Sequence, residues 1–295
     1  MHRARADSIL FRMLLLLSLP LNAWTQDQPV HGLWVWKTPS VLSAPHADTT
    51  LRDFCKSQHI NEVYVSFTSA AKAGDDAELA DLIRALHKSN IRVEALLSST
   101  DADEPGKPRE KLLEHIHEVI EFNRNHTKDP FDGVHLDIEP WQRPENKGQG
   151  NLNFLPGLVE AYSAVRRAAE PAHLTVNADI QNKLLKGDLA QRRSLLTSLP
   201  RFTLMLYEIS SPNDGETTEQ KEEKLRRNSE KFMEMAYEGL NNANLARMAI
   251  GLRTLDYDQL LPQMLSTVDE TLRGNPHYLG WAWHSYNDQP QATAQ

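Results

Sequence analysis

Short apolar segments rich in β-branched and aromatic residues recur along this chain about every 30 to 45 residues, as β-strands do when helices separate them. The eight segments are residues 31–38, 61–68, 91–98, 131–140, 174–180, 201–208, 247–254 and 278–286. Because strands that alternate with helices form βαβ units, this order predicts a parallel sheet. Eight such units within about 250 residues fit a closed (β/α)8 barrel, the TIM barrel of the α/β class.

Helical patterns, with apolar residues three and four positions apart, lie between these segments. The clearest are residues 76–90, 109–126, 154–170, 225–240 and 258–273, and weaker ones are 48–59 and 184–198. No G-x-G-x-x-G motif follows the first strand, which argues against an open dinucleotide-binding sheet. The chain ends in a polar segment with Pro290, so we expect the eighth helix to be short or absent. We expect one barrel domain over residues 28–295.

The first 25 residues have the layout of a secretory signal peptide, with Arg3, Arg5 and Arg12, then a leucine-rich run, then small and polar residues. The apolar run is shorter than the roughly 20 residues that a membrane-spanning helix needs. We therefore expect a secreted protein, extracellular or periplasmic, with no stable membrane insertion after cleavage. Removing residues 1–25 takes away three Arg and one Asp, which changes the formal net charge from −8 to −10.

The composition argues against several classes of partner and site. An acidic secreted domain has no net attraction to nucleic acid or anionic lipid, so we expect it to bind neither. Cys55 is the one cysteine, which excludes an internal disulfide framework and a cysteine-based metal site. We expect no cofactor.

The segment "FDGVHLDIEP" (131–140) is a strand by composition, yet every second residue near its end is ionisable. Because side chains alternate along a strand, His135, Asp137 and Glu139 share one face, and Val134, Leu136 and Ile138 share the other. In a barrel the apolar face packs on helices and the ionisable face points inward. Glu139 is then highest, at the carboxyl end of the strand, where barrel active sites lie.

These residues resemble a motif of family 18 glycoside hydrolases, the chitinase group. "DGVHLDIE" is similar to the fourth-strand signature D-G-x-D-x-D-x-E of that family, with His135 in place of the middle aspartate. "MLYE" (205–208) resembles the family's sixth-strand M-x-Y-D, with Glu208 in place of the aspartate. "GWAW" (280–283) looks like the eighth-strand segment that ends in the tryptophan under the bound sugar. The resemblance implies a barrel that cleaves or binds an N-acetylated polysaccharide.

The resemblance assigns chemistry to several of these positions. Glycoside cleavage needs an acid that protonates the leaving oxygen, and Glu139 matches that general acid/base. In the family the substrate's own 2-acetamido oxygen is the nucleophile, and Asp137 matches the residue that orients it. The expected contacts with the carbohydrate come from Tyr207 on the acetamido carbonyl, from Trp283 and Trp36 stacking on a sugar face, and from Asp179 and Glu208 on hydroxyls. Trp141, directly after the Glu–Pro pair, is expected on the rim as a further platform.

His135 is the departure from the family pattern. In the family the middle aspartate shares a proton with the next one and helps it change orientation. A histidine either replaces that hydrogen-bonding partner near the ligand or marks a lineage with changed activity, and a satisfied core histidine is an equal alternative. A metal site is disfavoured, because His135 lies roughly 13 Å from Glu139 along the strand.

Other functions stay open from the sequence. "IEP" also resembles the fourth-strand Asn-Glu-Pro of another barrel clan, whose retaining glycosidases need a second carboxylate at the end of strand seven. Arg253 stands at that place, and Asp256 and Asp258 come later. A barrel that binds a glycan without cutting it is a second alternative, and a barrel in which these acids are only structural is a third.

Overall fold

The structure is a computed structural model that describes residues 28–147, 152–207, 215–241 and 244–288. The expected signal peptide and Glu208 lie outside the described residues. Within the described ranges, no helix has both the length and the apolar composition to cross a membrane.

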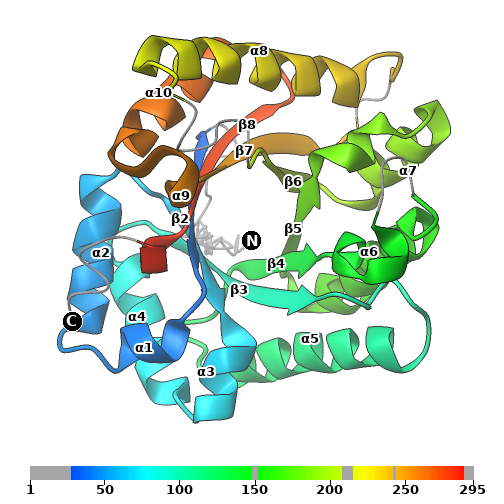
Figure 1. Ribbon diagram of the computed structural model, residues 1–295. Coiled ribbons are helices and arrows are strands. Elements are labelled where there is room, and N and C mark those ends of the chain that lie inside the picture. The colour runs from blue at the N-terminus through cyan, green and yellow to red at the C-terminus, as the bar shows by residue number, and fades with distance from the viewer. Residues whose placement is uncertain (1–27, 148–151, 208–214, 242–243, 289–295) are drawn as a thin grey trace, which may run out of the picture.

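Eight parallel strands form a closed barrel in the order in which they occur in the sequence, since β1 also pairs with β8 (Figure 1). The strands are β1 (Val30–Val35), β2 (Glu62–Ser66), β3 (Arg92–Ser99), β4 (Gly133–Ile138), β5 (Thr175–Gln181), β6 (Arg201–Met205), β7 (Arg247–Arg253) and β8 (Tyr278–His284). Each falls within or overlaps one of the eight segments expected from the sequence, so the predicted (β/α)8 barrel is confirmed.

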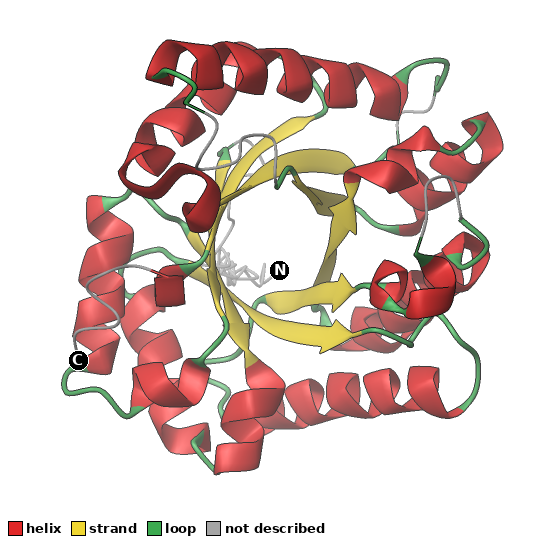
Figure 2. Ribbon diagram, in the orientation of Figure 1, coloured by secondary structure: helices red, strands yellow, loops and turns green. Residues whose placement is uncertain are grey.

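Helices surround the barrel on its outside, as Figure 2 shows in red. They are α1 (Thr38–Leu42), α2 (Ala47–Ser57), α3 (Phe67–Ala73), α4 (Asp76–His87), α5 (Lys107–Asn125), α6 (Leu155–Ala169), α7 (Leu189–Ser198), α8 (Thr218–Tyr237), α9 (Thr254–Tyr257) and α10 (Leu261–Leu272). Short 3-10 helices are η1 (Pro140–Gln142), η2 (Pro144–Asn146), η3 (Glu170–Ala172), η4 (Asn182–Lys186), η5 (Asp258–Leu260) and η6 (Tyr286–Asp288). Among the described residues, η6 alone follows β8, in agreement with the expected short or absent eighth helix.

Helix α8 begins seven residues before the predicted start, at Thr218 instead of residue 225. Its first turns carry no apolar repeat, and a capping box sets their start. The hydroxyl of Thr217 accepts from the backbone of Gln220, and the Gln220 side chain accepts from the backbone of Thr217. Pro262 lies in the first turn of α10, where a proline costs no hydrogen bond.

The two faces of β4 have the expected directions. Val134, Leu136 and Ile138 are fully buried in the core between strands and helices. His135 points into the barrel, where its ring stacks on Tyr64 with centroids 3.8 Å apart. The ionisable face of the strand therefore lines the barrel interior.

Charged side chains fill the deeper part of the barrel. Arg201 of β6 bridges Glu62 and Glu94, and Arg92 lies 3.2 Å from Glu62. Asn177 of β5 donates to Glu94. Buried charges are stable only when they are paired in this way, so the barrel floor is a closed ion-pair network.

Candidate active site

Glu139 stands at the carboxyl end of β4, at the mouth of the barrel. Its backbone N–H donates to the carbonyl oxygen of Ser99 on β3 at 2.8 Å, so the β3–β4 pairing continues one residue beyond the strand and keeps its side chain on the inward side. The side chain is partly exposed and accepts a hydrogen bond from Gln142. Asp137, one inward position deeper, is 8% exposed. The two carboxyl groups thus follow one another from the interior to the mouth.

Both carboxyl groups hold their protons more tightly than usual. Burial and the charge of Asp179 raise the pKa of Glu139, against the opposing effects of the Trp141 indole and the Lys183 ammonium. Burial, Asp179 and Glu139 raise the pKa of Asp137 well above its usual range. A raised pKa favours the protonated form, which is the form that a general acid needs.

Asp179 of β5 is the carboxylate whose charge acts on both of these groups. Its Oδ1 lies 2.8 Å from Nε2 of His135, and its Oδ2 accepts from Nε1 of Trp34 at 3.0 Å. The side chain is 1% exposed, because β5 continues for two residues beyond it. Asp179 was expected to bind sugar hydroxyls, but the structure places it inside the barrel, nearly inaccessible and with a partner on each oxygen.

His135 lies below the mouth and is fully buried, so its expected contact with the ligand is wrong. Nδ1 is 3.5 Å from Oε2 of Glu94, an ion-pair distance longer than a strong hydrogen bond. Burial disfavours the charged imidazolium, but Asp179 and Glu94 outweigh it and raise the pKa of His135 to about 9. Although burial opposes ionisation of Glu94, Arg201, His135 and Arg92 lower its pKa.

Aromatic side chains form one wall of the mouth. Trp36, just after β1, is partly exposed, and its Nε1 donates to Nε2 of His284 at 2.9 Å. Tyr207, just after β6, has its ring centroid 5.4 Å from that of His284. Burial and the charges of Asp179, Asp137 and Glu139 raise the pKa of Tyr207 well above its usual range, so its hydroxyl stays a donor near the acids.

Trp283 does not belong to this wall, so its expected sugar-stacking position is wrong. It is 4% exposed and packs edge-on against Phe54 of α2, and its Nε1 donates to the hydroxyl of Thr254 at 2.9 Å. Its neighbour Ala282 lies inside the barrel against Trp34 and Tyr64, so Trp283 must point outward. His284 has the inward direction and takes this place. Side-chain alternation in "GWAWHS" predicts the inward direction of His284, whereas the family resemblance assigns this place to Trp283.

Trp141 is not an exposed platform either, and that expectation is wrong. It is 7% exposed and packs beside Phe154, with the Lys183 ammonium 5.6 Å from its ring centroid. The 3-10 turn η1 folds the indole under the start of α6 instead of presenting it to solvent. Its place next to Glu139 makes it a support for that side chain.

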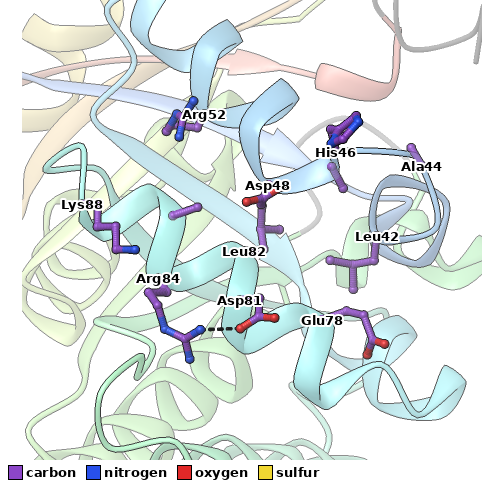
Figure 3. A pocket seen from close by; sticks show the side chains of 12 residues that line it. Leu42, Ala44, His46, Asp48, Arg52, Glu78, Asp81, Leu82, Arg84 and Lys88 are labelled. Atoms are coloured by element: carbon purple, nitrogen blue, oxygen red, sulfur yellow. Dashed lines mark hydrogen bonds and ion pairs between the residues drawn. The ribbon is translucent and has the colours of Figure 1, made fainter.

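Two further findings concern metal binding and the outer surface of the barrel. No group of three or more His, Cys, Asp or Glu is placed to hold a metal ion in the part of the chain that the structure describes. A groove of about 540 Å³ lies on the outside of the barrel between α4 and the α1–α2 segment (Figure 3). His46, Asp48, Arg84 and Lys88 are among its lining residues, and it shares none with the mouth.

No known protein family and no curated protein matches the sequence. Solved structures match the fold. The PgaB (BpsB) glycoside hydrolase domain from Bordetella bronchiseptica superposes with a TM-score of 0.54 at 12% identity, over 90% of this chain and 98% of that one. A GH18 chitinase from Pseudoalteromonas aurantia gives 0.53 at 11% identity, over 90% and 98%.

The chain has a chitinase-like barrel fold. A Group IV chitinase from Ostrinia furnacalis, solved with allosamidin, gives a TM-score of 0.50 at 12% identity over 77% of this chain and 66% of that one. Such low identities show shared architecture, and the chemistry must be argued from the site itself.

Proposed function

We propose that this protein is a glycoside hydrolase that cleaves an N-acetylated polysaccharide, with Glu139 as the general acid/base and Asp137 as its helper. One observation carries the proposal: Glu139 stands at the barrel mouth with a raised pKa, directly above a second acid whose pKa is also raised. An acid that protonates a glycosidic oxygen must keep its proton at the working pH. The same fold in the glycoside hydrolase domain from Bordetella and in the chitinases supports the reaction class.

The first step breaks the glycosidic bond. Glu139 gives its proton to the leaving oxygen while the carbonyl oxygen of the substrate's 2-acetamido group bonds to the anomeric carbon. This substrate-assisted route needs no second enzyme carboxylate as nucleophile. Asp137 holds and orients the acetamido N–H side, and the Tyr207 hydroxyl donates to its carbonyl oxygen.

The second step returns the enzyme to its starting state. Glu139, now a carboxylate, takes a proton from water, and the water oxygen bonds to the anomeric carbon as the acetamido oxygen leaves. Each step inverts the anomeric carbon once, so the two together retain its configuration. Trp36, partly exposed beside His284, is the aromatic surface for a sugar ring.

A two-carboxylate mechanism has weaker support. It needs a carboxylate at the end of β7, where Arg253 stands. Asp256, the next acid, is 3% exposed, and its Oδ1 lies 2.7 Å from the Arg253 guanidinium. The acid nearest in sequence is therefore engaged by that arginine, away from the strand end.

Glycan binding without cleavage is the second candidate, because a mouth with aromatic and acidic groups suits recognition as well as catalysis. Incubation of the mature protein with N-acetylated and unacetylated β-glycan oligomers, followed by mass spectrometry of products and calorimetric titration, separates the candidates. We expect shortened products from the N-acetylated oligomers alone. Affinity without products would favour the binding protein. The absence of both affinity and products would contradict both candidate functions. We further propose, from the leader sequence, that the protein acts outside the cytoplasm.

A further inference from the structure

A continuous line of charged side chains crosses the barrel from its floor to the mouth. Arg201 of β6 contacts Glu94 of β3, Glu94 lies 3.5 Å from His135 of β4, and His135 lies 2.8 Å from Asp179 of β5. These three contacts join four strands inside the barrel. The line ends at Asp179, whose charge raises the pKa values of Asp137 and Glu139.

The surroundings of His135 contain both apolar and charged groups. Tyr64 of β2 stacks on its ring at 3.8 Å, and Trp34 of β1 meets it edge-on at 6.0 Å. Asp137 follows it on the same strand, and Glu94 and Asp179 flank it from β3 and β5. From β6, Arg201 acts on it through Glu94.

The carboxylates of the ion-pair network in the barrel interior outnumber its guanidinium groups by one. Three carboxylates take part in the connected network: Glu62, Glu94 and Asp179. Two guanidinium groups, those of Arg92 and Arg201, oppose them. A protonated His135 makes the numbers equal, and it is in contact with two of the three carboxylates. Buried ion networks are stable when each charge has a partner, so the geometry favours the imidazolium.

We propose that His135 is a positioning residue, held as an imidazolium between Glu94 and Asp179, which fixes the Asp179 carboxylate where it acts electrostatically on Asp137 and Glu139. It does not touch the substrate, since it is fully buried. The inference rests on the proposed function only in that Asp137 and Glu139 are the acids it serves.

The consequence is that His135 acts on Asp137 and Glu139 only through Asp179. His135 places a positive charge against the Asp179 carboxylate, and Asp179 in turn raises the pKa of Asp137 and of Glu139. A neutral His135 could still donate to Asp179 through Nε2–H, but it would bring no positive charge to the buried carboxylate. The buried Asp179 carboxylate would then lack its counter-charge and would be held less firmly in the position from which it acts on the two acids.

The test is a direct measurement of the protonation state, which needs no turnover. The full mature chain is labelled with ¹⁵N-histidine, and long-range ¹H–¹⁵N correlations are recorded between pH 6 and pH 10. His135→Asn assigns the signal by its loss, and the exposed His117→Asn on α5 is the matched control. If His135→Asn does not fold, Asp179→Asn moves the titrations of His135 and His284, on both of which Asp179 acts, and His284→Asn tells the two signals apart.

We expect both ring nitrogens of His135 to be protonated at pH 7, and Asp179→Asn to move its titration to lower pH by at least one unit. A neutral ring with a single tautomer at pH 7 would overturn the inference. An imidazolium in a protein that cleaves no glycan would leave the inference standing and refute the proposed function. In an active protein, His135→Asn should lower kcat with little change in KM. A rise in KM with kcat unchanged would contradict a role in positioning.

Discussion

The Nε2 atom of His135 lies 2.8 Å from Oδ1 of Asp179, and Nε1 of Trp34 donates to the other oxygen of the same carboxylate. The chain thus holds a nearly inaccessible carboxylate between two donors from different strands, β4 and β1. Asp179 is close enough to act electrostatically on Asp137, Glu139 and the Tyr207 hydroxyl. This single contact links the barrel interior to the acids of the mouth.

Asp179→Asn should lower the pKa of Glu139, because the charge of Asp179 contributes to raising it. The active form of Glu139 is the protonated one, so activity falls as pH rises through its pKa. We expect the alkaline limb of the kcat/KM profile to move to lower pH in this variant. An unchanged limb, with Glu160→Gln as an exposed control, would contradict the electrostatic link.

His135 should stabilise the fold more at low pH than at high pH. Its pKa is raised to about 9 in the folded chain, against a usual value of 6.5. Its contribution is therefore fully present below about pH 6.5 and is lost as pH rises through about 9, with a size on the order of 3 kcal/mol. Urea unfolding should show a gap between wild type and His135→Asn that is wider at pH 6 than at pH 10. A gap that is constant across this range would argue against the imidazolium.

Trp36 and Trp283 should separate binding from stability. Trp36→Ala removes the partly exposed ring of the mouth and should weaken the binding of an N-acetylglucosamine oligomer roughly tenfold, about 1.4 kcal/mol. Trp283→Ala empties a buried site against Phe54 and should cost about 3–5 kcal/mol of unfolding free energy. Its folded fraction should bind normally. Calorimetry and urea unfolding of both variants check this, and a reversed pattern would restore Trp283 to the mouth.

Arg201 should be essential for the barrel floor. Arg201→Met leaves Glu62 and Glu94 with Arg92 as their shared partner, and breaking a buried ion pair in this way costs roughly 3–5 kcal/mol. Urea unfolding of this variant measures the loss, with the exposed Arg227→Met on α8 as the control. A loss below about 1 kcal/mol, the value of a surface pair, would mean that Arg92 suffices for both carboxylates.

Much of the fold follows from local sequence patterns. Strand and helix periodicity give the eight units, and alternation along "FDGVHLDIEP" gives the inward direction of His135. These signals are local because backbone geometry repeats every two residues in a strand and every 3.6 in a helix. The start of α8 could not be predicted in this way, since its cap between Thr217 and Gln220 has no apolar repeat.

The site was less predictable because its contacts are long-range. His135 and Asp179 are 44 residues apart in the chain, and the local sequence around neither residue predicts their contact. Both Trp141 and Trp283 are tryptophans next to site residues, but burial against Phe154 and Phe54 decides their positions. Alternation along β8 is present in the sequence and identifies His284 once Ala282 is known to point inward.

The most direct test of Glu139 as the general acid compares wild type with Glu139→Gln on an N-acetylglucosamine pentamer, with product formation followed by mass spectrometry and binding by calorimetry. Glutamine keeps the shape of the side chain but has no acidic proton to transfer to the leaving oxygen. We expect Glu139→Gln to form product at least ~10²-fold more slowly than wild type, with affinity and unfolding free energy nearly unchanged. A Glu139→Gln variant that cleaves the pentamer at the wild-type rate would contradict the assignment of the general acid.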